Sequence, residues 1–281
     1  MLGSRRAQRL GATYSGERRM WSRAGSVSAA IAAVVLTFAP GAHAKEWTTV
    51  RIGTEGAYPP FNFMDSNQQL QGFDIDIAKA ICEKEKVACE IVAQDWDGLI
   101  PALLAGKYDA IFASMSITEE RAKTIAFSER YYRSPALFVA SKGNASLAST
   151  PKGLAGKTVG AQSGTVSATY LQAVYAPAGV DVKLYATQDE ANLDLSSGRL
   201  DAMLADKVVM LPWLEKSQDG GCCQVIGQDV SDPKYFGDGI GAGMRKSDPE
   251  LKALIDKGIA DIRADGTYDK INAKYFPFSL Y

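Results

Sequence analysis

Two charged side chains and two neighbouring hydroxyl groups are suited to holding a small zwitterion. Ser114 and Ser116 come directly after a predicted strand, and Arg121 follows them within the segment SMSITEER at 114–121. A guanidinium binds a carboxylate through two parallel hydrogen bonds, which lysine cannot do. Asp206 follows another predicted strand, where it can pair with an ammonium group.

Gly164 and Thr165 stand between a predicted strand and a predicted helix. Backbone N–H groups at such a helix start can bind an anion, so this turn can assist Arg121. Each residue also has a purely structural interpretation: Arg121 can form a surface ion pair, and Thr165 and Asp206 can cap helices. Taken singly, these structural interpretations are favoured.

The residue types present exclude several kinds of site. The one histidine, His43, lies in an N-terminal leader, so no histidine remains for a Ser-His-Asp triad, Cys-His catalysis or imidazole-bound zinc. No G-x-S-x-G motif or phosphate-binding loop occurs. Asp74 and Asp76 flank a predicted helix start rather than form a catalytic pair. The net charge of -1 argues against a nucleic-acid partner.

Residues 1–44 have the pattern of a cleaved secretory signal peptide. They hold six arginines and one acid, then an apolar stretch at 29–39 and the sequence Ala42-His43-Ala44. The apolar stretch is about half the roughly 20 residues that a membrane span requires, which argues against a retained membrane anchor. Met20 is an alternative start. Without the leader, 25 basic and 31 acidic residues remain, a formal net charge of −6.

Four cysteines fit an oxidising compartment. Cys82 and Cys89 are seven residues apart at a helix-to-strand turn, where they can form a disulfide or stay as two buried thiols. Cys222 and Cys223 are adjacent, and the sequence leaves open whether they are bonded to each other or free.

Short β-rich segments alternate with helical patterns, which predicts two α/β units with largely parallel sheets. The predicted strands are 48–53, 89–93, 109–113, 136–140, 158–161, 182–185, 202–205 and 239–244. The predicted helices are 73–85, 97–104, 119–126, 166–174, 189–197, 207–216 and 249–264. The similar phrases GKYDA at 106–110 and GRLDA at 198–202 indicate that both units share one plan.

Five motifs resemble those of the periplasmic polar amino-acid-binding proteins that serve ABC importers, bacterial solute-binding protein family 3. In family order they are TEGAYPPF (54–61), GFDIDIA (72–78), WDGLIP (96–101), SMSITEER (114–121) and RADGTY (263–268). The resemblance covers residues 48–277 and is closest to the lysine/arginine/ornithine and histidine binders. The spacing of Cys82 and Cys89 also matches a disulfide of those members.

The resemblance implies a two-lobed periplasmic-binding-protein-like fold of type II, an α/β fold in which each lobe is a mostly parallel sheet flanked by helices. Lobe 1 would hold residues 45–133 plus 236–281, and lobe 2 would hold residues 134–235. Two crossings, near 132–135 and 230–234, would form a two-strand hinge.

The same resemblance implies roles for the site residues. Arg121 would take the α-carboxylate, helped by Ser116 and the backbone at Thr165. Asp206 would take the α-ammonium, with Ser114 nearby.

Three further residues would surround the ligand side chain in this family. Tyr58 and Trp96 would enclose it, and Glu55 would face its distal charge. Two aromatic faces and a carboxylate favour a flat, delocalised cation. We therefore rank arginine first, then lysine and ornithine, then histidine.

The implied protein is a monomeric, non-enzymatic component of the periplasm of a Gram-negative bacterium, which closes on a cationic amino acid and delivers it to an inner-membrane ABC permease. No cofactor or metal is implied. One alternative is an opine binder of the octopine or nopaline type, against which Asp206 argues because an opine carries a substituted α-amino group. Others are a cyclohexadienyl or arogenate dehydratase-like enzyme with Glu55 as its acid, and a sensor domain.

Overall fold

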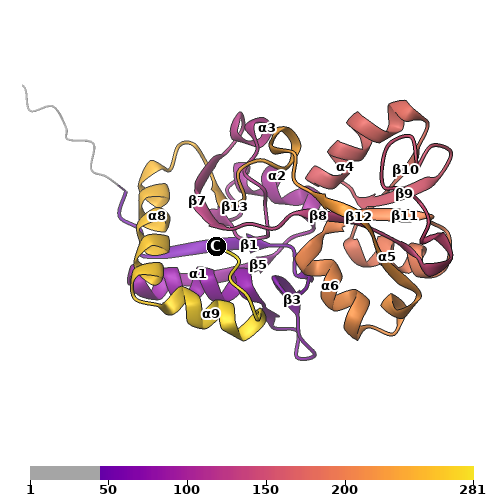
Figure 1. The fold of residues 1–281 in the computed structure, drawn as a ribbon. Coiled ribbons are helices and arrows are strands. Elements are labelled where there is room, and N and C mark those ends of the chain that lie inside the picture. The colour runs from indigo at the N-terminus through magenta and orange to yellow at the C-terminus, as the bar shows by residue number, and fades with distance from the viewer. Residues whose placement is uncertain (1–44) are drawn as a thin grey trace, which may run out of the picture. The chain divides into compact units, whose positions relative to one another are not determined.

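The computed structural model describes residues 45–281, so the predicted signal peptide at 1–44 lies outside the described residues. Residues 45–281 form two five-stranded sheets with helices packed against them (Figure 1). The predicted two-lobed α/β class is confirmed. None of the described helices is both long enough and apolar enough to cross a membrane.

The first sheet has the strand order β5-β1-β6-β13-β7. Strand β1 runs parallel to β5 and β6, whereas β13 runs antiparallel to β6 and β7, so the sheet is mixed. Its strands are β1 (Thr49–Thr54), β5 (Ala88–Ala93), β6 (Ala110–Ile111), β7 (Ala126–Tyr132) and β13 (Ile240–Met244).

Helix α1 packs against α8 and α9 beside this first sheet (Figure 1). The helices of this half are α1 (Phe73–Lys84), α2 (Leu99–Leu104), α3 (Glu119–Ala122), α8 (Pro249–Ala264) and α9 (Thr267–Tyr275). A small antiparallel sheet joins β2 (Ala57–Tyr58), β3 (Asn62–Met64) and β4 (Leu70–Gln71).

The second sheet repeats this arrangement in the order β10-β9-β11-β8-β12. Strand β9 is parallel to β10 and β11, and β8 is antiparallel to β11 and β12. The strands are β8 (Ala136–Ser141), β9 (Thr158–Gln162), β10 (Asp181–Tyr185), β11 (Ala202–Asp206) and β12 (Cys223–Val230). The helices are α4 (Val166–Tyr170), α5 (Gln188–Ser196), α6 (Lys207–Lys216) and α7 (Pro233–Phe236).

The two similar phrases take equivalent places in the two sheets. Asp109 precedes β6, and its carboxylate accepts a hydrogen bond from the backbone N–H of Arg51 at 3.1 Å. Asp201 precedes β11 and accepts in the same way from the N–H of Thr158 at 3.0 Å. The shared plan that the sequence indicated is therefore present in the hydrogen bonding.

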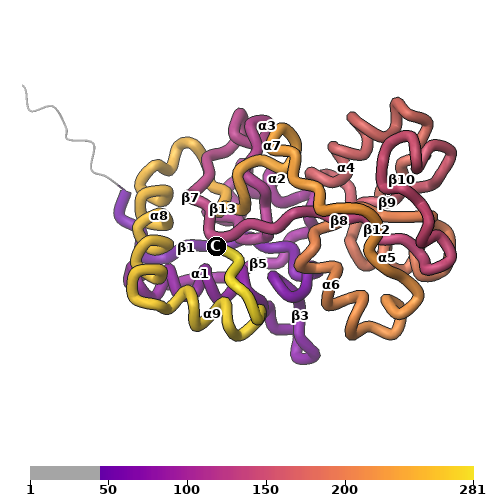
Figure 2. The backbone as a smooth tube through the Cα atoms, in the orientation of Figure 1, coloured from indigo at the N-terminus to yellow at the C-terminus, as the bar shows by residue number. Residues whose placement is uncertain are grey.

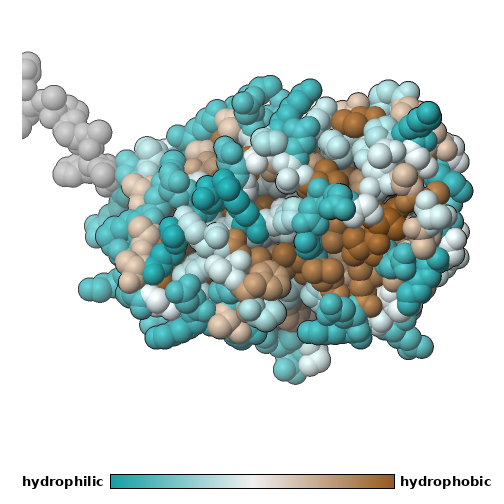
Figure 3. Space-filling view, in the orientation of Figure 1, coloured by the Kyte–Doolittle hydropathy of each residue, from teal (hydrophilic) through white to brown (hydrophobic). Residues whose placement is uncertain are grey.

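The chain passes between the two sheets from β7 to β8 and returns from β12 to β13 (Figure 2). The two passes lie side by side, because β12 pairs with β8 and Val230 stands opposite Ala136. In Figure 3 hydrophobic residues gather near β12 and α6 on a surface that is otherwise mostly hydrophilic. The lobe boundaries at residues 133–134 and 235–236 stay a prediction.

The structure differs from the prediction in several elements. The predicted helix 119–126 is wrong beyond Ala122, because the chain turns there and buries Ile125 before it enters β7, where Phe127 is buried as well. Strand β12 and helix α9 were not predicted. Both cysteine pairs are disulfides: Cys82–Cys89, with a Cα–Cα distance of 6.0 Å, and the adjacent pair Cys222–Cys223.

Candidate functional site

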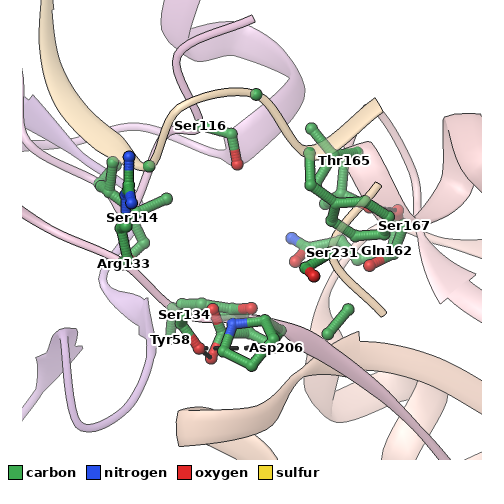
Figure 4. A pocket seen from close by; sticks show the side chains of 18 of the residues that line it. Tyr58, Ser114, Ser116, Arg133, Ser134, Gln162, Thr165, Ser167, Asp206 and Ser231 are labelled. Carbon is green, nitrogen blue, oxygen red and sulfur yellow. Dashed lines mark hydrogen bonds between the residues drawn. The ribbon is translucent and has the colours of Figure 1, made fainter. Parts of the chain in front are cut away.

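A cavity of about 410 Å³ lies between the two sheets, at the carboxyl ends of their parallel strands. Polar side chains surround its open centre (Figure 4). Ligands of open α/β sheets bind at such strand ends. All eight predicted site residues line the cavity, namely Glu55, Tyr58, Trp96, Ser114, Ser116, Arg121, Thr165 and Asp206.

Arg121 supplies an unpaired positive charge to this cavity. Its Nη1 donates to the carbonyl oxygen of Ser116 and its Nη2 to that of Gly164, both at 3.0 Å. No carboxylate of residues 45–281 forms an ion pair with it, so the surface ion-pair interpretation is wrong for this part of the chain. Burial lowers the pKa of the guanidinium to about 10. An anionic group of a ligand would offset the cost of burying this charge.

Asp206 both caps helix α6 and keeps an oxygen free. Its Oδ1 accepts from the backbone N–H of Val208 at 2.7 Å and from the hydroxyl of Ser134 at 2.6 Å. Its Oδ2 makes neither of these two bonds and is the oxygen available to an ammonium group. Burial raises the pKa of Asp206 to about 6, against the effect of those hydrogen bonds. The capping interpretation is correct, and it leaves the ligand interpretation open.

A buried network behind the cavity holds Ser114 in place. Ser114 has a left-handed backbone with φ of 53°, and its hydroxyl donates to Oδ2 of Asp74 at 2.9 Å. Asn62 and the hydroxyl of Tyr131 donate to the same buried carboxyl group at 2.9 and 2.7 Å. Asp74 does stand in the first turn of α1, as expected, and it also fixes a residue of the cavity wall.

Glu55 is the buried carboxylate at another part of the cavity, where β1 ends. Only 9% of it is exposed, and its Oε1 accepts a hydrogen bond of 2.6 Å from the side-chain amide of Gln162. Burial raises the pKa of Glu55 to about 7; the Gln162 bond opposes this, and the nearby carboxylates of Asp189, Asp95 and Asp97 add to it. No basic side chain of residues 45–281 forms an ion pair with Glu55.

Two aromatic side chains belong to the cavity wall. Burial raises the pKa of Tyr58 well above its ordinary value, so its hydroxyl stays protonated at neutral pH. The ring of Trp96 lies near Arg121, whose guanidinium carbon is 5.3 Å from the ring centroid. Trp96 therefore contacts the cation of the site itself, a contact that the sequence did not predict.

The loop after β9 approaches the opposite half of the molecule. Thr165 caps α4 by accepting from the N–H of Ala168 at 3.2 Å, which confirms the capping interpretation. The hydroxyl of Ser163 donates to the carboxylate of Asp97 at 2.6 Å, and Gly164 accepts from Arg121. The two sheets are thus bridged on this side of the cavity.

The sequence missed several residues of the wall. Gln162, Ser167 and Gln188 come from β9, α4 and α5 and gave no signal, because each fits an ordinary strand or helix position. Others belong to the two crossings, which the motifs do not cover. These crossing residues are Arg133, Ser134, Pro135, Ala136, Ser231, Pro233, Phe236, Gly237, Asp238, Gly239 and Ile240.

Comparison with known families places most of the described residues in one family. The sequence matches the bacterial extracellular solute-binding proteins, family 3, over residues 50–278. The chain belongs to this family. As a family-3 solute-binding protein, it places its cavity residues on segments within the matched region.

Similar members of the family are named as binding proteins, not as enzymes. An L-arginine-binding protein of Pseudomonas aeruginosa is 46% identical over 232 residues, 83% of this chain and 89% of the relative. The lysine/arginine/ornithine-binding periplasmic protein of Escherichia coli K12 is 43% identical over 248 residues, 88% and 95% of the two chains. Both relatives are named for the amino acids that they bind.

A solved structure supports the same assignment. An ancestral arginine-binding protein bound to arginine is 41% identical and superimposes with a TM-score of 0.75, covering 82% of this chain and 98% of that one. The two-lobed fold of this solute-binding protein is thus shared along nearly the full length of an arginine-binding relative.

Proposed function

We propose that this protein binds a cationic amino acid in the cavity and delivers it to an ABC permease of the inner membrane. Arginine is the preferred ligand, followed by lysine and ornithine and then histidine. The observation that carries the charge preference is Glu55, a buried carboxylate that lines the cavity and has no basic partner among residues 45–281. A buried charge is stable only when it is paired, so the ligand supplies the cation.

The α-groups of the ligand would meet the other two charges. Arg121 takes the α-carboxylate with the backbone at Thr165, and Oδ2 of Asp206 takes the α-ammonium. Because Arg121 lies in α3 of the half that holds the first sheet and Asp206 ends β11 of the second sheet, a ligand that contacts both stabilises the closed arrangement more than the open one. The closed form would be the one that docks on the permease.

The compartment follows from the relatives. The Escherichia coli relative is named a periplasmic protein, and two disulfides persist in an oxidising compartment. We infer that residues 1–44 are a cleaved signal peptide and that the protein acts in the periplasm as a monomer. N-terminal sequencing of the exported protein would give Lys45 as its first residue.

A thermal-shift screen over the amino acids, octopine and nopaline tests this function. A ligand at 100 times its Kd stabilises the folded state by about 2.7 kcal/mol, which raises the Tm of a chain of this size by roughly 5–10 °C. We expect the largest rise with arginine and smaller rises with lysine and ornithine. A rise with glutamine or glutamate and none with arginine would overturn the proposal.

A further inference from the structure

The side chain of Gln162, the last residue of β9, is buried and held by two hydrogen bonds. Only 3% of it is exposed, and its amide nitrogen donates to Oε1 of Glu55 at 2.6 Å and to the carbonyl oxygen of Ala186 at 3.1 Å. Both of these partners are acceptors, so together they fix which end of the amide carries the nitrogen. The orientation of the side chain follows from this network.

The carbonyl oxygen of Gln162 is therefore left for something else. Neither Oε1 of Gln162 nor Oε2 of Glu55 accepts a hydrogen bond from any donor of residues 45–281. Both residues line the cavity, and Figure 4 places Gln162 on the same wall as Thr165 and Ser167. One neutral and one charged acceptor thus stand next to each other in a desolvated part of the site.

We propose that Gln162 is a specificity-determining residue, whose carbonyl oxygen accepts one N–H of a guanidinium while Glu55 accepts another. This inference rests on the proposed function and names the residue that selects arginine over lysine. A guanidinium presents five N–H donors in a rigid plane and can serve two adjacent acceptors at once. An ammonium is a compact charge whose pairing with Glu55 does not require the second acceptor.

The same hydrogen bond links recognition to closure. Gln162 belongs to the second sheet and Glu55 follows β1 of the first, so their bond forms only when the two sheets are close. Closure would thereby orient Glu55 toward the ligand. The charged groups around Glu55 are the carboxylates of Asp189, Asp95 and Asp97, which add no competing cation.

Calorimetric titration of arginine and lysine into Gln162→Leu tests the proposal. We expect the affinity for arginine to fall at least about tenfold and that for lysine by less than about threefold, because a lost hydrogen bond to a charged group has this order of effect. The pH below which arginine affinity declines should also rise, since Glu55 loses a donor that favours its charged form. Gln162→Met, which keeps the side-chain length, is the second variant if leucine perturbs folding.

Gln172→Leu is the matched control. It makes the same substitution at an exposed glutamine that does not line the cavity and makes no side-chain hydrogen bond within the described part of the chain, so the ratio of arginine to lysine affinity should not change. Equal losses for both ligands in Gln162→Leu and Gln162→Met, or no loss for either, would overturn the role of Gln162. A wild-type protein that binds neither ligand would instead contradict the proposed function itself.

Discussion

Arg121 is a cation without a counter-charge in the described structure, and its environment explains why an anion should bind there. Its guanidinium is held by two carbonyl oxygens, which orient it without neutralising it. Such a group gains most from a carboxylate that arrives with the ligand. At the scale of single residues, this is the contact common to every amino acid.

Arg121→Ala should therefore weaken binding of all amino acids together. Removing one partner of a buried hydrogen-bonded charge pair costs about 2–5 kcal/mol, so the Kd for arginine and for lysine should each rise at least about 30-fold by calorimetry. Trp96→Ala is the comparison variant, which should alter the ratio of the two affinities instead. Wild-type affinity in Arg121→Ala would remove Arg121 from the site.

The affinity for arginine should fall in acid. The ligand-free pocket holds Glu55 with a pKa of about 7 and Asp206 with a pKa of about 6, and a cation binds only their ionised forms. Binding near pH 6 must therefore release protons. Between pH 8 and pH 5 we expect the affinity to fall by about 1000-fold, since each unit below the pKa of a required carboxylate is about tenfold and pH 5 lies about two units below that of Glu55 and about one below that of Asp206.

The stability of the ligand-free protein should change with pH in the opposite sense. Because burial raises the pKa of Glu55 above its ordinary value, the folded state retains a proton that the unfolded state has lost between about pH 4.5 and 7. Its contribution disfavours folding as pH rises through this window, by on the order of 3 kcal/mol. Chemical denaturation of the ligand-free protein between pH 5 and pH 8 measures this stability change, and titration of arginine in buffers of different ionisation enthalpy measures the proton release on binding. Both effects should be smaller in Glu55→Gln, and an unchanged proton release in that variant would contradict the assignment.

Single-residue roles could be predicted only in part. The sequence presented Asp206 as either a cap or a ligand contact, whereas its two oxygens divide these roles between them. Gln162 could not be predicted at all, because its partner Glu55 is 107 residues away in the sequence. Local patterns report on the strand that Gln162 ends, and not on the side chain that folding brings beside it.

At the scale of elements, the loop from β9 to α4 determines how closely the two halves approach. Gly164 has φ of 64°, and a Cβ at this position would lie 2.6 Å from Oδ1 of Asp97 and 3.2 Å from Nε1 of Trp96. Only glycine combines this conformation with so close an approach. The bridge from Arg121 to Gly164 depends on the same geometry.

Gly164→Ala should thus impair closure. The strained backbone costs about 1–2 kcal/mol of stability, and displacement of the loop should weaken arginine binding by about tenfold or more in calorimetry. Gly179→Ala is the matched control: its φ of 89° imposes a comparable backbone penalty, but nothing lies within 4 Å of its Cβ. If both variants bound arginine equally well, the loop would have no role in closure.

Helix α1 supports the cavity wall through Asp74, so removing the Asp74 carboxylate should lower the stability of the protein. Asp74→Ala would leave the buried groups of Asn62, Ser114 and Tyr131 without their acceptor, which should lower the free energy of unfolding by about 3 kcal/mol or more. Asp76→Ala removes bonds at a more exposed position and should cost about 1 kcal/mol or less. Equal denaturation midpoints for both variants would contradict this role.

The alternation of strands and helices was predictable because most elements carry their own pattern, as in β1, β9 and α8. The three short strands β2, β3 and β4 were not predicted, and neither were β7 and β12, which run beside the crossings. Strand β7 follows a segment with helical spacing, and β12 is irregular near Gly227, so pairing with distant strands decided their structure. Tertiary contacts override local propensity in such segments.

At the scale of the whole molecule, the charges in the cavity and the net charge of the protein both favour a cationic ligand. Two sheets of the same strand plan face each other across a cavity where Glu55, Asp206 and Arg121 match the three charges of a basic amino acid. The residues after the predicted leader carry a formal net charge of −6, which favours the approach of cations, although physiological salt screens this attraction beyond about 8 Å.

The central claim is that the ligand must carry a positive charge to pair with Glu55. Calorimetric titration with L-arginine and with L-citrulline tests it most directly, because citrulline keeps the shape of arginine and replaces the guanidinium with a neutral urea group. We predict tight binding of arginine and at least about 100-fold weaker binding of citrulline, as expected for a buried carboxylate left unpaired. Equal affinity for the two ligands would contradict the account.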